Sequence, residues 1–392
     1  MKKIILAIDS FKGCLTSAEV EQCVEQTIKE QIPYCQVIPL AVSDGGEGIL
    51  DILVKTTQGH FITIKAHDPL MRIRKARYGV SGDGKTAIIE MAEINGLPLV
   101  SEKERDPMKT TTYGTGELIA DALKRGYRNF LVGIGGSATN DAGLGMLQAL
   151  GAKLYDREKL LEEHGGQTMG QVNRIDTNGI LAGLEESSFV VACDVHNPFC
   201  GPQGAAYVFG AQKGGTPAQL AILDKAMYSL SAIIEKTTGK KVKELQGGGA
   251  AGGLGAAFYA FMHAQLKPGI NLMLDAVGFD NYLDGTDLVI TGEGKADSQT
   301  LQGKVPAGVL ERANRHSVPV ALLAGKIEDK DQLKKAGFKF LLQVSPDTLP
   351  LLEAMKPEIA LENIRRATLS LLKSVSPQSA DFQSSKSEQT SA

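Results

Sequence analysis

Short apolar runs alternate with amphipathic segments at the start of the chain. An apolar run over residues 3–8 is followed by helical periodicity that places Val20, Val24 and Ile28 on one face. A second apolar run at 36–42 precedes another amphipathic stretch. Parallel strands connected by helices produce this pattern, so the opening segment predicts a doubly wound α/β sheet.

The same pattern returns near the C-terminus. Apolar runs at 287–291, 319–324 and 339–344 are separated by amphipathic segments, and two helices are expected at about 348–355 and 358–373. Five such strands suffice for one parallel sheet. We therefore predict that the two ends of the chain form one α/β domain, and that the middle forms a second α/β domain inserted into it.

The periodicity changes around residue 60. Segments 60–65 and 72–78 alternate, with many charges on one side, as half-exposed antiparallel strands do. Helices are then expected at 115–125, 140–150, 217–237 and 250–263, with strands at 129–134 and 189–193. The predicted domains are 1–60 with 283–375, an inserted mixed α/β domain over 61–282, and a disordered Ser- and Gln-rich tail over 376–392.

Composition narrows the possible partners. The 392 residues are 43% hydrophobic and 22% charged, and the net charge of -3 gives no basis for binding nucleic acid or an anionic membrane. No apolar run reaches the roughly 20 residues that a membrane span needs. The five scattered cysteines indicate reduced thiols rather than disulfides or a zinc site. We expect a cytoplasmic protein with small-molecule partners, as a monomer or homodimer.

One charged stretch follows a predicted strand directly. The strand at 287–291 is expected to break at Gly292 and Gly294, after which Glu293, Lys295, Asp297 and Lys304 follow closely. Ligands of open α/β sheets bind at the carboxyl ends of strands, and glycines let the backbone approach a ligand. This stretch is therefore a candidate site, although each charge alone would fit a solvated turn.

Other acidic residues also follow strands, and lysines accompany them. The acids are Asp9, Asp44, Glu47 and Asp194, and the additional lysines are Lys12 and Lys213. Carboxylate oxygens with interspersed lysines suit a Mg²⁺-nucleotide, because the cations offset charge on a transferring phosphoryl group. For each carboxylate taken singly, a helix cap or a surface charge is the alternative.

Two glycine-rich loops precede predicted helices. The loop at 133–143 would expose backbone N–H groups at a helix N-terminus, which favours anions, although Asn140 or Asp141 could simply cap that helix. The loop at 246–254 is similar, and close helix packing is its alternative explanation.

A formal P-loop match runs from Gly79 to Thr86, with the strand at 189–194 as a possible partner. The segment before it, 72–77, carries four cations in six residues and so fits poorly as a strand buried on both faces. A hairpin turn at 81–84 explains the glycines better. A P-loop NTPase that uses Lys85 remains an alternative function.

Taken in order, these motifs resemble the bacterial glycerate kinases of type I over residues 4–372. The segments that carry the resemblance are 9–13 (DSFKG), 44–48 (DGGEG), 67–70 (HDPL), 111–118 (TTYGTGEL), 135–141 (GGSATND), 193–198 (CDVHNP), 212–214 (QKG), 250–253 (AAGG) and 291–294 (TGEG), with Asp297 and Lys304. One departure is Ala142, where the family usually has glycine.

The resemblance implies an ATP-dependent kinase that converts D-glycerate to 2-phospho-D-glycerate. It also implies a discontinuous flavodoxin-like domain, an inserted second domain and an active site in the cleft between them. The cofactors would be ATP and Mg²⁺. A non-catalytic protein that binds hydroxy acids and keeps the fold is a further alternative.

Residue chemistry and position suggest a division of roles, with direct in-line transfer as the mechanism. Asp194, then Asp297, are the candidates for orienting or deprotonating the attacking hydroxyl, and Lys12 and Lys304 would contact phosphates or the glycerate carboxylate. The expected metal ligands are Asp44, Glu47 and Glu293. The expected substrate- and phosphate-binding residues are Asp9, Ser10, Gly135, Gly136, Ser137, Asn140, Asp141, Asn197 and Lys213.

Overall fold

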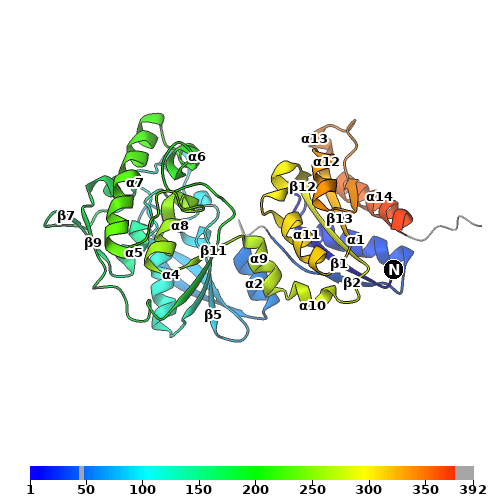
Figure 1. The fold of residues 1–392 in the computed structure, drawn as a ribbon, viewed down its shortest axis with the longest axis horizontal. Helices are drawn as coiled ribbons and strands as arrows, with labels where there is room; N and C mark the ends of the chain where they lie inside the picture. The colour runs from blue at the N-terminus through cyan, green and yellow to red at the C-terminus, as the bar shows by residue number, and fades with distance from the viewer. Residues whose placement is uncertain (44–47, 376–392) are drawn as a thin grey trace, which may run out of the picture. The chain divides into compact units, whose positions relative to one another are not determined.

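The computed structural model describes residues 1–43 and 48–375, which form two compact units (Figure 1). The terminal unit comprises Met1–Val42 and the chain from Gly278 onward, and the central unit comprises Ser43–Val277. Residues 1–42 and 278–375 thus belong to one unit, and the central unit is inserted between them. The predicted tail at 376–392 lies outside the described residues.

The terminal unit contains a five-stranded parallel sheet. Its strands are β1 (Lys3–Ile8), β2 (Gln36–Pro39), β12 (Leu288–Ala296), β13 (Val320–Ile327) and β14 (Phe340–Gln343). They lie in the order β14-β13-β12-β1-β2, which is the flavodoxin-like order 2-1-3-4-5 when the strands are numbered within this unit. The predicted parallel α/β sheet is confirmed.

Helices cover this sheet on both faces. They are α1 (Ser17–Gln31), α10 (Phe279–Leu283), α11 (Val305–Arg315), α12 (Lys330–Ala336), α13 (Leu351–Ala354) and α14 (Pro357–Val375), with a short 3-10 helix η5 (Ser298–Leu301). The apolar face of α1, with Val20, Val24 and Ile28, packs in one core with alternate residues of β1 and with α14. α11 contacts β1 and β12.

The central unit is built on a six-stranded mixed sheet. Its strands, in spatial order, are β11 (Gln265–Lys267), β10 (Ser188–Ala192), β6 (Asn129–Gly133), β5 (Thr86–Glu90), β4 (Ile73–Val80) and β3 (His60–His67). The first four are parallel, whereas β4 runs antiparallel to β5 and β3 antiparallel to β4. This confirms the expected antiparallel pair at the start of the insertion.

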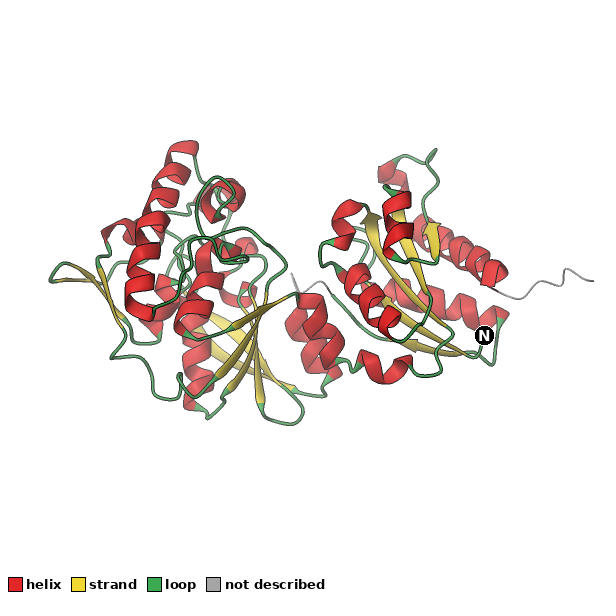
Figure 2. Ribbon diagram, viewed as in Figure 1, coloured by secondary structure: helices red, strands yellow, loops and turns green. Residues whose placement is uncertain are grey.

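A small antiparallel sheet was not foreseen from the sequence. It consists of β7 (Lys153–Asp156), β8 (Lys159–Leu161) and β9 (Arg174–Asp176), and Figure 2 shows it apart from the six-stranded sheet. These strands have only three or four residues, which is too short for period-2 alternation to be recognised.

The helices of the central unit pack around the larger sheet. They are α2 (Ile49–Thr56), α3 (Ala92–Asn95), α4 (Tyr113–Lys124), α5 (Leu144–Ala149), α6 (Ala205–Phe209), α7 (Pro217–Thr238), α8 (Ala250–Phe261) and α9 (Gly269–Ala276). The 3-10 helices are η1 (Leu97–Leu99), η2 (Glu102–Glu104), η3 (Gly166–Gln171) and η4 (Ala211–Lys213). No helix in the two described ranges is long and apolar enough to cross a membrane.

The first boundary between the units differs from the expected one. The structure divides the chain after Val42 rather than at residue 60, so α2 belongs to the central unit. A Cβ on Gly79 of β4 would lie 2.2 Å from Val54 Cγ2 and 3.0 Å from Leu50 Cδ1. The apolar face of α2 therefore packs directly on β4, and periodicity alone could not show which sheet it would cover.

Residues 79–86 form a β-hairpin rather than a P-loop. β4 and β5 pair antiparallel, with Gly79 opposite Ile88, and the turn lies between them. The Asp83 carboxylate accepts hydrogen bonds from Ser81 Oγ at 2.5 Å and from the Lys85 N–H at 3.1 Å. A P-loop must be followed by a helix whose first N–H groups face the phosphates, and here a strand follows. The P-loop alternative is therefore wrong.

Candidate active site

In the terminal unit, the end of β1 lies beside Gly292 of β12. The Asp9 N–H donates to the Gly292 carbonyl at 2.9 Å, immediately after Ile8 pairs with Gly292. A Cβ on Gly294 would lie 3.6 Å from Lys12 N, so the loop after β1 passes along β12. Asp9 therefore lies beside the charged stretch after residue 291, as follows when the two ends of the chain form one sheet.

The strand itself continues farther than expected. β12 does not break at Gly292 and Gly294 but runs to Ala296, where it pairs with Ile327 of β13. A Cβ on Gly292 would lie 2.2 Å from the Leu323 carbonyl oxygen. This glycine thus permits close approach of two strands, which sequence alone could not distinguish from a strand break.

Glu293 is the most buried acid of this group, with 7% of its surface exposed. Its Oε2 lies 3.3 Å from Lys304 Nζ, and its Oε1 has no hydrogen-bond partner among the described residues. Burial raises the pKa of Glu293, while hydrogen bonding to Thr300 and the charge of Lys304 oppose that shift. A buried carboxylate oxygen without a donor suits a cation.

Asp297 and Lys295 have local partners. Asp297 caps η5 by accepting the Gln299 N–H at 2.9 Å, and Lys295 Nζ lies 3.5 Å from its Oδ2 and 3.0 Å from Glu328. Asp297 thus fills the structural role considered for a carboxylate at this position. Ser10 follows Asp9 at the end of β1, and its N–H donates to Asp9 Oδ1 at 2.7 Å.

The central unit contains a cavity of about 550 Å³ at the carboxyl ends of β6 and β10. This volume falls within the range of small-molecule sites. Its polar lining includes five predicted residues, Gly135, Gly136, Ser137, Asp194 and Lys213, together with Arg105 and Gln212. Segments distant in sequence therefore meet at one cavity, as expected for a parallel sheet.

Lys213 is the most unusual charge in this cavity, because its side chain is 2% exposed. Its Nζ donates to Ser137 Oγ at 2.8 Å and to the Thr139 carbonyl at 2.7 Å. Burial lowers the pKa of Lys213 to about 7, and the nearby Asp141 carboxylate opposes this shift. A lysine poised near neutrality gains its proton readily when an anion approaches.

Asp194 follows β10 directly and lines the same cavity. Its Oδ1 accepts the Gly269 N–H at 2.7 Å, at the first residue of α9, and this bond orients the carboxylate. Asn197 does not line the cavity: its Nδ2 donates to the Gln203 carbonyl at 2.9 Å and its own carbonyl accepts the Gly249 N–H at 3.0 Å.

Asp141 is fully buried and does not line the cavity. Its carboxylate accepts the N–H groups of Thr112 at 2.8 Å, Gly143 at 3.1 Å and Gly145 at 3.2 Å. Helix α5 starts at Leu144, not at residue 140 as expected. The N–H groups predicted to receive a ligand anion at this helix start are therefore occupied by the carboxylate of Asp141.

The neighbours of Asp141 are equally enclosed. Asn140 is fully buried, with Nδ2 3.4 Å from Met227 Sδ and no partner for Oδ1 among the described residues. Ala142 has φ 53°, in the left-handed region, which a glycine would adopt without the strain of a side chain. Of the predicted anion loop, only Gly135, Gly136 and Ser137 line the cavity.

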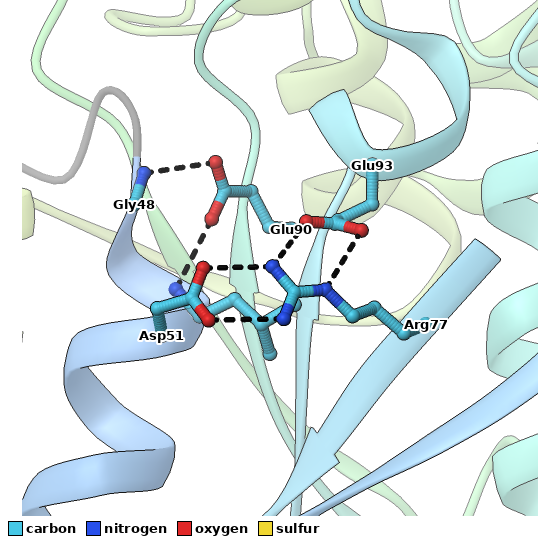
Figure 3. Close-up of polar contacts among 6 residues, drawn as sticks. Gly48, Asp51, Arg77, Glu90 and Glu93 are labelled. Atoms are coloured by element: carbon cyan, nitrogen blue, oxygen red, sulfur yellow. Dashed lines mark hydrogen bonds and ion pairs between the residues drawn. The ribbon is translucent and has the colours of Figure 1, made fainter.

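The predicted metal ligands Asp44 and Glu47 lie outside the described residues. The residue that follows them, Gly48, donates its N–H to Glu90 Oε1 at 3.0 Å, and Leu50 donates to Oε2 at 3.1 Å (Figure 3). Burial raises the pKa of Glu90, and these two N–H groups oppose that shift. Glu90 thus anchors the start of α2, a role that could not be recognised before the fold was known.

Within residues 1–43 and 48–375, no three His, Cys, Asp or Glu side chains are gathered closely enough to hold a metal ion. Arg105 and Gln212 are the polar cavity residues that sequence reasoning missed. Gln212 belongs to the QKG motif, so the prediction of Lys213 as a binding residue could have been extended to Gln212. Arg105 directly follows η2 in a segment without periodicity, and nothing in the sequence marked it.

Comparisons with known proteins all find glycerate kinases. Residues 4–376 match the model described as the glycerate kinase family. The glycerate kinase of Bacillus subtilis (strain 168) is 42% identical, over 95% of this chain and 97% of the relative. The glycerate 2-kinase of Escherichia coli (strain K12) is 42% identical, over 93% of this chain and 96% of the relative. The chain also resembles a Salmonella typhimurium LT2 protein whose crystal structure is described as that of a glycerate kinase 2. The two structures superpose with a TM-score of 0.83 and are 42% identical in sequence, over 95% of this chain and 98% of the other.

Proposed function

The chain belongs to the glycerate kinase family of phosphotransferases, and from this premise we propose that it transfers the γ-phosphoryl group of ATP to D-glycerate, giving 2-phospho-D-glycerate. The Escherichia coli relative is named glycerate 2-kinase, which supports the position of the phosphorylated hydroxyl. The observation that carries the proposal is the cavity that brings Asp194 and Lys213 together at the ends of two parallel strands.

The reaction we propose is a direct in-line transfer. The glycerate hydroxyl oxygen forms a bond to the γ-phosphorus, the bond from that phosphorus to the β–γ bridging oxygen breaks, and ADP leaves. Asp194 orients the hydroxyl and takes its proton. Lys213 supplies positive charge close to the developing negative charge, in a site where burial strengthens that interaction.

We also propose roles for the charged residues of the terminal unit. Lys12 and Lys304 contact phosphate or carboxylate oxygens, and Asp9 and Ser10 belong to the same group at the end of β1. The partnerless Oε1 of Glu293 fits a hard cation, so Glu293 would hold the Mg²⁺ that accompanies ATP. When bound, such an ion offsets negative charge on the phosphates.

Substitution of Asp194 by Asn tests the proposed base. Asn keeps an oxygen that can accept the Gly269 N–H, so α9 stays capped while the proton acceptor is lost. We expect kcat for glycerate-dependent ADP release to fall by about 10²–10⁴-fold, with an unchanged circular dichroism spectrum. Glu186→Gln is the matched control, because that side chain is 79% exposed. A near wild-type kcat in the Asp194 variant would remove the residue from this role.

The wild-type assay tests the function itself. ATP and D-glycerate are incubated with the enzyme, and phosphorus NMR distinguishes the 2-phosphate from the 3-phosphate. Formation of the 3-phosphate would contradict the proposed position. Binding of glycerate without any ADP release would instead support the alternative of a non-catalytic protein that binds hydroxy acids.

A further inference from the structure

Arg105 lines the cavity of the central unit but has no assigned role. Its Nε is buried and has no hydrogen-bond partner among the described residues. A guanidinium remains charged at any physiological pH and offers five N–H donors. A buried donor without an acceptor costs free energy, which a ligand that supplies the acceptor recovers.

The backbone of Arg105 packs against Gly214, the residue that follows Lys213. Gly214, with φ 90°, packs so closely that a Cβ there would lie 2.3 Å from the Arg105 carbonyl oxygen and 2.7 Å from its Cβ. Two chain segments more than 100 residues apart thus hold two cationic side chains at one cavity. This close packing indicates that the fold holds Arg105 in a defined position at the cavity.

Arg105 and Lys213 both retain N–H donors for which no acceptor in the described chain is seen. Lys213 has three N–H donors, and two of them bond to Ser137 Oγ and the Thr139 carbonyl. Asp141, the carboxylate that offsets the charge of Lys213, is itself committed to Thr112, Gly143 and Gly145. Positive charge and hydrogen-bond donors are therefore left for a group that enters from outside.

We propose that Arg105, acting with Lys213 in the same cavity, binds an oxyanion of a reactant, and that Arg105 is a substrate-binding residue. The planar fork of a guanidinium matches the paired oxygens of a carboxylate or a phosphate. Under the proposed function, on which this inference rests, the oxyanion is either the carboxylate of glycerate or a phosphate of ATP. Both have the same chemistry, and binding experiments separate them.

The test uses Arg105→Gln and Arg105→Lys in the full-length chain. Dissociation constants for D-glycerate alone and for ADP alone are measured by titration calorimetry. We expect Arg105→Gln to weaken one of the two ligands at least tenfold, and Arg105→Lys to restore only part of the loss, because lysine keeps the charge but lacks the fork. A loss confined to glycerate identifies the carboxylate, and a loss confined to ADP identifies the phosphate.

Kinetics and a surface variant control for a merely structural effect. Arg74→Gln removes an exposed arginine of β4 and should leave both dissociation constants unchanged. In Arg105→Gln, KM for the affected reactant should rise more than kcat falls, as for a residue that binds ground state and transition state alike. If both dissociation constants stay within twofold of wild type in Arg105→Gln, the inference is overturned.

Proton uptake provides an independent readout of the partner lysine. An anion beside Lys213 raises the pKa of its ammonium group, so binding at pH 8 should take up protons, seen as a dependence of the binding enthalpy on buffer ionisation heat. Lys213→Met should abolish this uptake, and Arg105→Gln should retain it. No uptake in the wild type would exclude Lys213 from the oxyanion site.

Failure of this inference is distinguishable from failure of the proposed function. If the wild type does not phosphorylate D-glycerate, the function is wrong, and the titrations with glycerate, ADP and inorganic phosphate still show whether Arg105 binds an oxyanion. If the wild type turns over and both ligands bind Arg105→Gln normally, only the role of Arg105 is wrong.

Discussion

Glu21 offers a quantitative test of buried electrostatics in the terminal unit. This α1 residue is 5% exposed, and its Oε1 accepts the Ile8 N–H at 3.2 Å at the end of β1. Burial raises the pKa of Glu21 to about 8; the Ile8 N–H opposes this shift and the charge of Glu25 adds to it. The Glu21→Gln substitution keeps the acceptor and the shape but removes the ionisation.

The sign of the effect follows from proton binding. The folded state retains the proton of Glu21 up to about pH 8, whereas the unfolded chain releases it above about pH 4.5. Between these values raising the pH favours unfolding, so Glu21 increasingly destabilises the wild type. pH 7 lies about 2.5 units above the pKa of Glu21 in the unfolded chain and below its pKa in the folded protein. Each of these units lowers the free energy of unfolding by ~1.4 kcal/mol, so the total loss at pH 7 is on the order of 3 kcal/mol.

We therefore expect Glu21→Gln to be more stable than wild type by an amount that grows from roughly 1 kcal/mol at pH 5 to on the order of 3 kcal/mol at pH 7. Hydrogen exchange of the β1 amides, corrected for the intrinsic effect of pH, reports opening of this unit rather than of the whole chain. Glu362→Gln, at a side chain that is 50% exposed on α14, is the matched control. A stability difference that does not change with pH would refute the reasoning.

Two further substitutions test local structure. Thr16→Ala removes the capping box at the start of α1, in which Thr16 and Glu19 accept each other's backbone N–H groups. It should lower the free energy of unfolding, measured in urea, by ~1 kcal/mol, and Thr16→Ser should lower it much less. Equal losses in the two variants would contradict the capping role. Arg77→Lys breaks the contact of Arg77 with both Asp51 and Glu93 (Figure 3). Because the Arg77 side chain is 35% exposed, the free energy of unfolding should fall by about 1 kcal/mol. Arg125→Lys, which loses a single contact with Asp121, should lower it less, and a larger loss in that variant would contradict the argument.

The sheets could be predicted because their residues repeat one pattern many times. The apolar runs at both ends of the chain appear as β1, β2, β12, β13 and β14, and helical periodicity identified α1, α7 and α14 with small boundary errors. Where an amphipathic helix could cover either of two sheets, periodicity gave no answer. The assignment of α2 depended on Gly79, whose missing side chain makes room for Leu50 and Val54.

The candidate site was predictable in location but not in detail. Topology places the carboxyl ends of neighbouring parallel strands together, so Asp9 with Glu293, and Gly135 with Asp194, could be grouped from strand order alone. Arg105 could not be found in this way, because it reaches the cavity from an irregular segment whose position depends on packing against Gly214.

A carboxylate that follows a strand can serve the fold or a ligand, and its local sequence does not separate the two. Asp141 and Asp297 both accept the backbone N–H groups of the turn that follows them, so these oxygens already have donors supplied by the chain. Glu293 retains a buried oxygen that no described residue satisfies. The cost of leaving such an oxygen without a donor is what marks a position for a cation or substrate, and that cost depends on burial and partners that only the folded chain defines.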